Sequence, residues 1–180
     1  MTTRSGVVLI TGCSSGIGRA TARVFERKGW RVWATARDPN DIEALAAAGC
    51  RTAALDVTDD DEIRGVIDEI DERDGGLDCL INNASYGQTG AIEDVPLDRI
   101  HAQFDVNVYG PVRLVQAALP LLRARDGGTI VNVSSFLGRM VFPFRGAYAD
   151  RSTRSKPFRT RSAWNSTAPA STSRSWSRVL

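Results

Sequence analysis

Residues 7–18 read Val7-Val8-Leu9-Ile10-Thr11-Gly12-Cys13-Ser14-Ser15-Gly16-Ile17-Gly18, and they indicate the fold more clearly than any other part of the chain. The apolar first part predicts a buried strand, and the glycine-rich second part predicts a turn that leads into a helix. Such a turn can cradle phosphate groups, because free amides at a helix N-terminus face the anion. The stretch therefore predicts a nucleotide-binding unit.

The three glycines of this turn have different expected roles. Gly12 lets the chain turn sharply off the strand, Gly16 lets the backbone approach a diphosphate, and Gly18 lets the helix pack closely on the sheet. The plainer alternative is a tight strand-to-helix connection that binds nothing. The flanking apolar pattern favours the phosphate-binding interpretation.

Length and composition predict one globular unit. A chain of 180 residues can form one sizeable core and no second full domain. Hydrophobic residues make up 42% and charged residues 24%, which fits a soluble globular protein. No apolar run approaches the length of a membrane span, and Met1-Thr2-Thr3-Arg4 leads into the first strand without a signal-peptide core. We therefore expect a cytoplasmic protein.

The sequence gives no sign of a metal site. Cys13, Cys50 and Cys79 are odd in number and unevenly spaced, which favours small buried thiols over disulfides or metal ligands. His101 is the sole histidine and lies on a predicted helix, where a surface or core-edge position is expected. One histidine cannot build a metal site.

Strands and helices are expected to alternate along the chain. Strands are predicted at residues 7–10, 30–36, 52–57, 77–81 and 129–133, and helices at 40–48, 59–73 and 107–125. Thr58 is expected to cap the second of these helices, with Asp59, Asp60 and Asp61 stabilising its first turn. Alternating strands and helices with short links predict an α/β fold, a doubly wound parallel sheet.

Three motifs together resemble the short-chain dehydrogenase/reductase family across residues 6–148. They are Thr11-Gly12-x-x-x-Gly16-x-Gly18, Asp56-Val57 at the end of a predicted strand, and Asn82-Asn83-Ala84-Ser85 after the next one. The resemblance implies a Rossmann-type fold and a nicotinamide dinucleotide cofactor. The cofactor-binding residues that it implies are Gly12, Ser14, Ser15, Gly16, Ile17, Gly18, Arg37, Asp56, Val57, Asn83 and Ala84. One departure is Ser85, where the family has glycine.

The catalytic residues also follow from the resemblance. Ser135 would hold a substrate carbonyl, Tyr148 would donate a proton, and Asn107 would hold a water in the family's proton relay. Hydride transfer to a ketone leaves negative charge on oxygen, so a nearby acid and fixed hydrogen-bond donors suit this chemistry. The plainer alternative is that Ser135 caps a strand end and Tyr148 is an ordinary surface residue.

The catalytic cation of the family is missing. A phenol with a pKa near 10 is a poor acid-base group at neutral pH unless a cation lowers its pKa. In the family, a lysine four residues after the tyrosine provides this charge, but position 152 is serine here. Lys156 lies two turns from Tyr148 and precedes Pro157, which disfavours a helix there, so we do not assign it the role.

The composition changes after Tyr148. Residues 149–180 contain Lys156 and six arginines but a single acidic residue, Asp150, and they are rich in Ser and Thr. When residues 152–177 are back-translated with G/C-rich wobble bases and read one base out of frame, they give HALEAVSDALRVELHRPGIDVALV. That string resembles the family's sequence after its catalytic lysine. We therefore expect a one-nucleotide shift between about codons 149 and 153.

This expectation divides the chain into an incomplete dinucleotide-binding domain at residues 1–148 and an aberrant, disordered basic tail at 149–180. The sheet would be incomplete at its C-terminal edge. Apolar surface left on strand 129–133 and helix 107–125 would promote aggregation or degradation. The helix expected to carry Tyr148 packs in the dimer interface of family members, so the loss of its apolar face would weaken the family's usual homo-oligomer. The alternative is a genuine Ser/Arg-rich tail that binds nucleic acid or an acidic partner.

Cofactor and substrate are indicated only in outline. The predicted second strand ends in Ala36-Arg37-Asp38, where Arg37 can pair with a 2′-phosphate and Arg19 can assist. NADP is therefore favoured, although Asp38 keeps NAD open. Residues 86–96 and Phe142-Pro143-Phe144 resemble those of retinol- or steroid-type reductases, which implies a hydrophobic alcohol or ketone, with no nucleic acid or membrane partner.

Two function classes remain open from the sequence. The first is an NADP-linked oxidoreductase that acts on a hydroxyl or carbonyl group. The second is a catalytically dead dinucleotide-binding or partner-binding protein, or a non-functional product of the frame shift. Binding of NADPH without turnover would support the second class.

Overall fold

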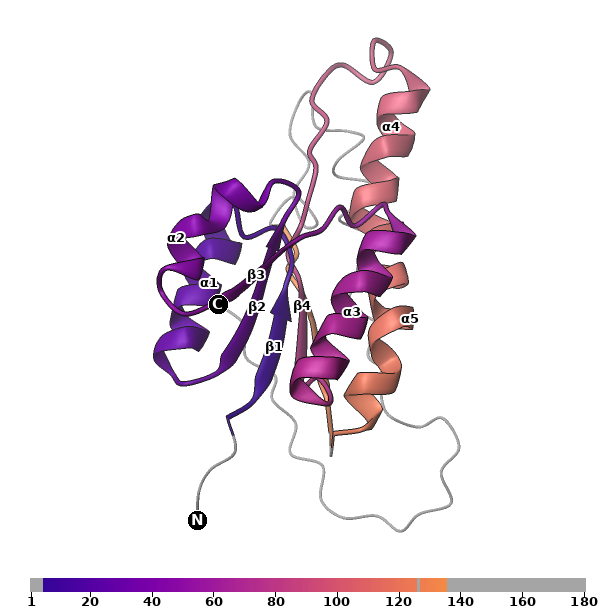
Figure 1. Ribbon diagram of the computed structural model, residues 1–180. Coiled ribbons are helices and arrows are strands. Elements are labelled where there is room, and N and C mark those ends of the chain that lie inside the picture. Colours follow the sequence, from indigo (N-terminus) through magenta and orange to yellow (C-terminus); the bar gives the residue numbers. More distant parts are fainter. Residues whose placement is uncertain (1–4, 126, 136–180) are drawn as a thin grey trace.

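A computed structural model describes residues 5–125 and 127–135, which form a parallel sheet covered by helices on both faces (Figure 1). The strand order is β3-β2-β1-β4-β5, with every neighbouring pair parallel. The strands are β1 (Val7–Ile10), β2 (Arg31–Ala36), β3 (Arg51–Ala54), β4 (Cys79–Asn82) and β5 (Thr129–Asn132). The predicted doubly wound α/β sheet is confirmed.

Two layers of helices enclose the sheet. One layer holds α1 (Gly16–Arg27), a 3-10 turn (Pro39–Ile42) and α2 (Glu43–Ala46). The other holds α3 (Asp60–Asp74) and a long helical segment made of α4 (Leu97–Phe104), a π-helical turn (Asp105–Tyr109) and α5 (Gly110–Arg123). None of the helices in the described ranges is both long enough and apolar enough to cross a membrane.

The residues of β1 belong to two separate hydrophobic cores, one on each face of the sheet. Val7 and Leu9 pack with α3 and α5, whereas Val8 and Ile10 pack with α1 and α2, because alternate side chains of a strand point to opposite faces. All four residues are fully buried, as expected for a central parallel strand with both faces covered. The apolar run at residues 7–10 is continuous because both faces of β1 are buried.

Several predicted boundaries are wrong. β3 ends at Ala54, so Asp56 and Val57 lie in the turn beyond the strand and not at its end. The cap of α3 is Asp59, whose side chain accepts from the amides of Asp61 and Glu62, and not Thr58. Thr58 instead donates its hydroxyl to Asp56 at 2.7 Å. The helix expected at 107–125 belongs to a longer helical segment that begins at Leu97.

Two apolar side chains near the end of the described part are exposed. Val131 on β5 is 40% exposed and Val112 on α5 is 49% exposed. Within the described residues, β5 forms one edge of the sheet. Tyr148, Lys156 and the tail at 149–180 lie outside the described residues.

Candidate cofactor-binding site

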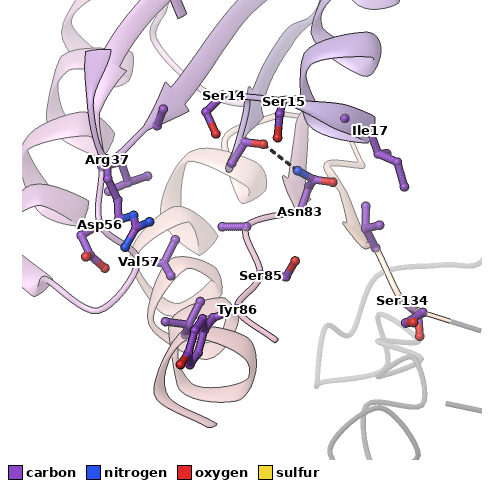
Figure 2. Close-up of a pocket in the computed structure, with 18 residues that line it drawn as sticks. Ser14, Ser15, Ile17, Arg37, Asp56, Val57, Asn83, Ser85, Tyr86 and Ser134 are labelled. Carbon is purple, nitrogen blue, oxygen red and sulfur yellow. Dashed lines mark hydrogen bonds between the residues drawn. The ribbon is translucent and has the colours of Figure 1, made fainter. Parts of the chain in front are cut away.

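A cavity of about 630 Å³ opens where the chain leaves the carboxyl ends of β1, β2, β3 and β4 (Figure 2). The strand order reverses between β1 and β4, and such a reversal creates a crevice in which open α/β sheets bind ligands. The residues that line the cavity are Gly12, Ser14, Ser15, Gly16, Ile17, Ala36, Arg37, Leu55, Asp56, Val57, Asn83, Ala84, Ser85, Tyr86, Val106, Val133, Ser134 and Ser135.

The structure therefore brings most of the sequence-predicted site residues together. All expected cofactor residues except Gly18 line this one cavity, and so does Ser135. Gly18 lies behind the turn, Asn107 is buried beneath the cavity wall, and Tyr148 is outside the described residues. The sequence related Tyr86, in the stretch 86–96, to the substrate and not to the cofactor site, and it did not single out Val106 or Ser134.

The glycine turn is open on its cavity side and tightly packed behind. Gly16 has a φ of 55°, and an added Cβ would meet nothing within 4 Å, so this position leaves room for a ligand. At Gly18, a Cβ would collide with the Gly12 carbonyl oxygen and lie 2.5 Å from Asn83 Nδ2. Gly18 therefore allows α1 to pack against the turn itself, and not only against the sheet as expected.

The loop after β4 holds the glycine turn in place. Asn83 Nδ2 donates to the carbonyl oxygens of Thr11 and Gly12, both at 2.9 Å. Thr11 Oγ1 in turn accepts from the backbone amides of Asn83 and Ala84, both at 3.0 Å. Because these bonds join two strand ends, the turn is fixed without a ligand, and amides at the start of α1 remain free of intrahelical partners.

The Asp56–Val57 turn forms another side of the cavity. Asp56 Oδ1 accepts from the Thr58 amide at 2.9 Å, and the Asp56 amide donates to Glu62 Oε2 at 2.6 Å. These bonds fix the backbone next to Val57, which is buried and whose side chain faces Gly110 as well as the cavity. An apolar side chain beside a fixed polar turn suits a flat, partly polar ring.

The two arginines considered for a phosphate take different positions. Arg37 is exposed and lines the cavity, next to Asp56 and Val57 in Figure 2. Arg19 does not line it; its guanidinium donates to the Ser14 carbonyl and, at 2.9 Å, to the Asp41 carbonyl. Asp38 accepts from the Asn40 amide at 2.9 Å and caps the 3-10 turn. Arg19 therefore joins two loops beside the cavity.

Asn107 is held by the backbone of Tyr86. Its Oδ1 accepts from Tyr86 N at 2.8 Å, and its Nδ2 donates to Tyr86 O at 2.5 Å. The residue sits in the π-helical turn and is 6% exposed. These contacts give Asn107 a visible role in fixing the loop after β4.

The cysteines are free and buried, as predicted. Burial raises the pKa of Cys13 to about 12 and that of Cys79 to about 11, so both remain thiols at neutral pH. Cys13 lies in the glycine turn, yet its Sγ donates to the Ile10 carbonyl and contributes packing. Among the described residues, no group of three or more His, Cys, Asp or Glu side chains is placed to hold a metal ion.

Comparison with known proteins agrees with this geometry. Residues 6–150 match the family model described as short chain dehydrogenase. An NADPH-dependent 1-acyldihydroxyacetone phosphate reductase of Schizosaccharomyces pombe is 42% identical over 144 residues, which cover 78% of this chain and 48% of that protein. A probable short-chain type dehydrogenase/reductase, VdlC, of Helicobacter pylori is 36% identical over 143 residues, which cover 79% of this chain and 53% of the relative.

Solved structures show the same likeness. A short-chain dehydrogenase from Streptomyces avermitilis has a TM-score of 0.79 at 38% identity, over 85% of this chain and 57% of that one. An alcohol dehydrogenase from Thermococcus sibiricus, complexed with 5-hydroxy-NADP, has a TM-score of 0.76 at 28% identity, over 83% of this chain and 66% of that chain. The chain spans about half the length of the curated relatives that it matches. It belongs to the short-chain dehydrogenase/reductase family.

Proposed function

We propose that this protein binds NADP(H) in the cavity at the carboxyl ends of the strands and belongs to an enzyme that transfers hydride to or from a small, apolar alcohol or ketone. One observation carries the proposal: the glycine turn, the Asn83–Ala84 loop, the Asp56–Val57 turn and Ser135 all line the same cavity. The open space at Gly16 fits the requirement that backbone amides approach a diphosphate.

The preference for NADP over NAD rests on Arg37. This exposed guanidinium lines the cavity beside the Asp56–Val57 turn, where it can form paired hydrogen bonds with a 2′-phosphate. Asp38, the residue that would favour a free ribose hydroxyl, already accepts from the Asn40 amide. The similar fission-yeast reductase is NADPH-dependent, and the similar Thermococcus dehydrogenase is complexed with 5-hydroxy-NADP, which also supports the preference.

The chemistry assigns roles to two hydroxyl groups. The bound cofactor would supply or accept the hydride. Ser135, on the segment after β5, would hold the substrate oxygen, and Tyr148 would exchange its proton with that oxygen. Asn107 would hold the relay water that the family resemblance implies, while its side chain keeps the loop after β4 in position. Tyr148 needs a nearby cation for this role, because its ordinary pKa is about 10.

We further propose that the basic segment 149–180 is read in a shifted frame and that residues 1–148 form an incomplete dinucleotide-binding domain. Arg151 encoded as CGA or AGA, followed by Ser152 encoded as AGC, contains the lysine triplet AAG when read one base early. That triplet begins at the third base of codon 151, one base before codon 152, which is the codon four after that of Tyr148. A single missing base between them therefore accounts both for the lost lysine and for the family-like string that follows.

The second candidate function is dinucleotide binding without turnover, and Ser152 at the position of the family's lysine favours it. The 180-residue chain and a frame-restored chain, in which one added base brings a lysine to position 152, can be compared directly. NADPH fluorescence measures binding, and a panel of apolar ketones and alcohols measures turnover. We expect both chains to bind NADPH and only the restored chain to turn over substrate. Absence of binding in both folded chains would refute the proposed function.

A further inference from the structure

A second buried amide, Gln103, lies one helical turn before Asn107. Gln103 is fully buried on α4, and its Oε1 accepts from the Gln88 amide at 2.8 Å. Asn107 bonds both backbone groups of Tyr86, two residues earlier in the same loop. Residues four apart on a helix share one face, and alternate residues of an extended segment share one side. The two amides therefore hold alternate residues of the loop after β4.

The loop held in this way carries an aromatic wall of the cavity. Tyr86 lines the cavity, and Figure 2 shows it across from Ser14 and Ser15 of the glycine turn. Its phenol donates to Gln88 Oε1 at 2.6 Å. Tyr86 is thus fixed at two points: Asn107 holds its backbone, and Gln88 holds its hydroxyl group. The backbone of Gln88 is in turn held by Gln103.

We propose that Gln103 is a positioning residue of the cofactor site, which acts through Gln88 to hold the Tyr86 ring as a wall for NADP(H). This inference rests on the proposed function, since it assumes that the cavity holds the cofactor. A wall that is already ordered lowers the conformational entropy lost on binding. Removing the Gln103 acceptor leaves the Gln88 amide without this partner, so the loop loosens and binding weakens.

The test uses the full 180-residue chain and NADPH as the probe. Gln103→Leu keeps the side chain's approximate size but removes the acceptor, and Tyr86→Ala removes the wall. We expect each variant to weaken NADPH binding about 5- to 30-fold. Because Gln103 acts through Tyr86, the double variant should bind no more weakly than Tyr86→Ala alone. Gln116→Leu, at an exposed position of α5, is the matched control and should bind like the parent chain.

Hydrogen exchange of the Gln88 amide gives a second readout that needs no ligand. Gln103→Leu should speed exchange at Gln88 while leaving amides of β1 protected. Additive losses in the double variant, or unchanged NADPH affinity in a folded Gln103→Leu chain, would overturn the inference and leave the proposed function standing. Failure of the folded parent chain to bind NADPH would overturn the proposed function and, with it, this role of Gln103.

Discussion

The side-chain amide of Asn83 bonds the carbonyl oxygen of Gly12 at 2.9 Å, so the loop after β4 holds the turn after β1. The same nitrogen also donates to Thr11 O. Asn83→Ala removes both bonds and should lower the free energy of unfolding by about 1–3 kcal/mol while weakening NADPH binding. Thermal unfolding and NADPH titration measure the two effects. Gln116→Ala, at an exposed position outside the cavity, serves as the control. An Asn83→Ala chain as stable as the control would contradict this role.

Gly16 and Gly18 should respond differently to the same substitution. Gly18→Ala forces a Cβ into the Gly12 carbonyl, which is backbone and cannot move aside without displacing α1. Gly16→Ala meets open space and costs about 1–2 kcal/mol for its positive φ, yet its methyl group would occupy the diphosphate position. We expect Gly18→Ala to lower the melting temperature clearly. Gly16→Ala should lower NADPH affinity with a small change in melting temperature, and equal destabilisation by both would contradict the account.

Arg37 should control the choice between the two cofactors. Removing a charge-assisted contact with a phosphate costs about 1.5–3 kcal/mol, which corresponds to about tenfold or more in affinity. Arg37→Ala should therefore raise the Kd for NADPH by at least about tenfold and leave the Kd for NADH within about twofold. Arg23→Ala removes one exposed charge from α1 and controls for net charge. Equal losses for NADPH and NADH would show that Arg37 does not contact the 2′-phosphate.

Asp74, at the end of α3, should link stability to pH. Its carboxylate is fully buried and bonds Arg31 at 2.5 Å, Trp33 Nε1 at 2.8 Å and Arg51. Burial alone would raise the pKa of Asp74, but the hydrogen bonds from Trp33 and Arg51 and the two positive charges outweigh burial and hold the pKa below its ordinary value. The unfolded chain therefore takes up this proton first as the pH falls.

The stabilisation from Asp74 should be complete above about pH 5 and should decline below about pH 4, as the pH falls toward the lowered pKa. Asp74→Asn should cost about 1.5–3 kcal/mol near neutral pH, and the difference should shrink at low pH. Chemical unfolding of the parent chain and the Asp74→Asn variant between pH 3 and 7 measures this difference in the free energy of unfolding. Asp68→Asn, at an exposed position, is the control. A constant difference across that range would contradict the assignment.

The coding DNA should carry one missing base between the Tyr148 codon and the third base of codon 151. Sequencing across codons 145–160 and beyond codon 180 tests this prediction. Restoring the base should give a lysine four residues after Tyr148 and an amphipathic helix after it. If the frame is confirmed and no family-like sequence underlies it, residues 149–180 are a genuine basic segment.

The sequence predicts the sheet well because its signals are local. Four consecutive apolar residues in β1 indicate burial on both faces, and both faces are indeed covered. The glycine spacing also predicts which backbone segment faces the cavity. Strand ends are predicted less well, because Asp56 bonds Thr58 and turns the chain before Val57 can continue β3.

The helix after the loop shows what local signals miss. The sequence predicted a helix around His101 and another at 107–125, and it missed that the π-helical turn at Asp105–Tyr109 joins them into one segment that begins at Leu97. In the sequence, Gln103 looks like an ordinary polar residue. Its hydrogen bond to the Gln88 amide joins two residues whose separation matches no helix or strand period, so no sequence pattern predicts it. The family resemblance pointed to Asn107, but only the structure shows that both polar atoms of its side-chain amide are hydrogen-bonded to the backbone of Tyr86.

The most direct test of the NADP(H) site is hydrogen exchange of the full chain with and without NADPH, followed by mass spectrometry. The account predicts slower exchange in peptides covering residues 12–18, 37–41, 56–58 and 83–88. It also predicts unchanged exchange around Asp74, which lies at the opposite ends of the strands. NADPH that leaves all four cavity segments unchanged, or slows exchange only elsewhere, would contradict the claim that this cavity binds the cofactor.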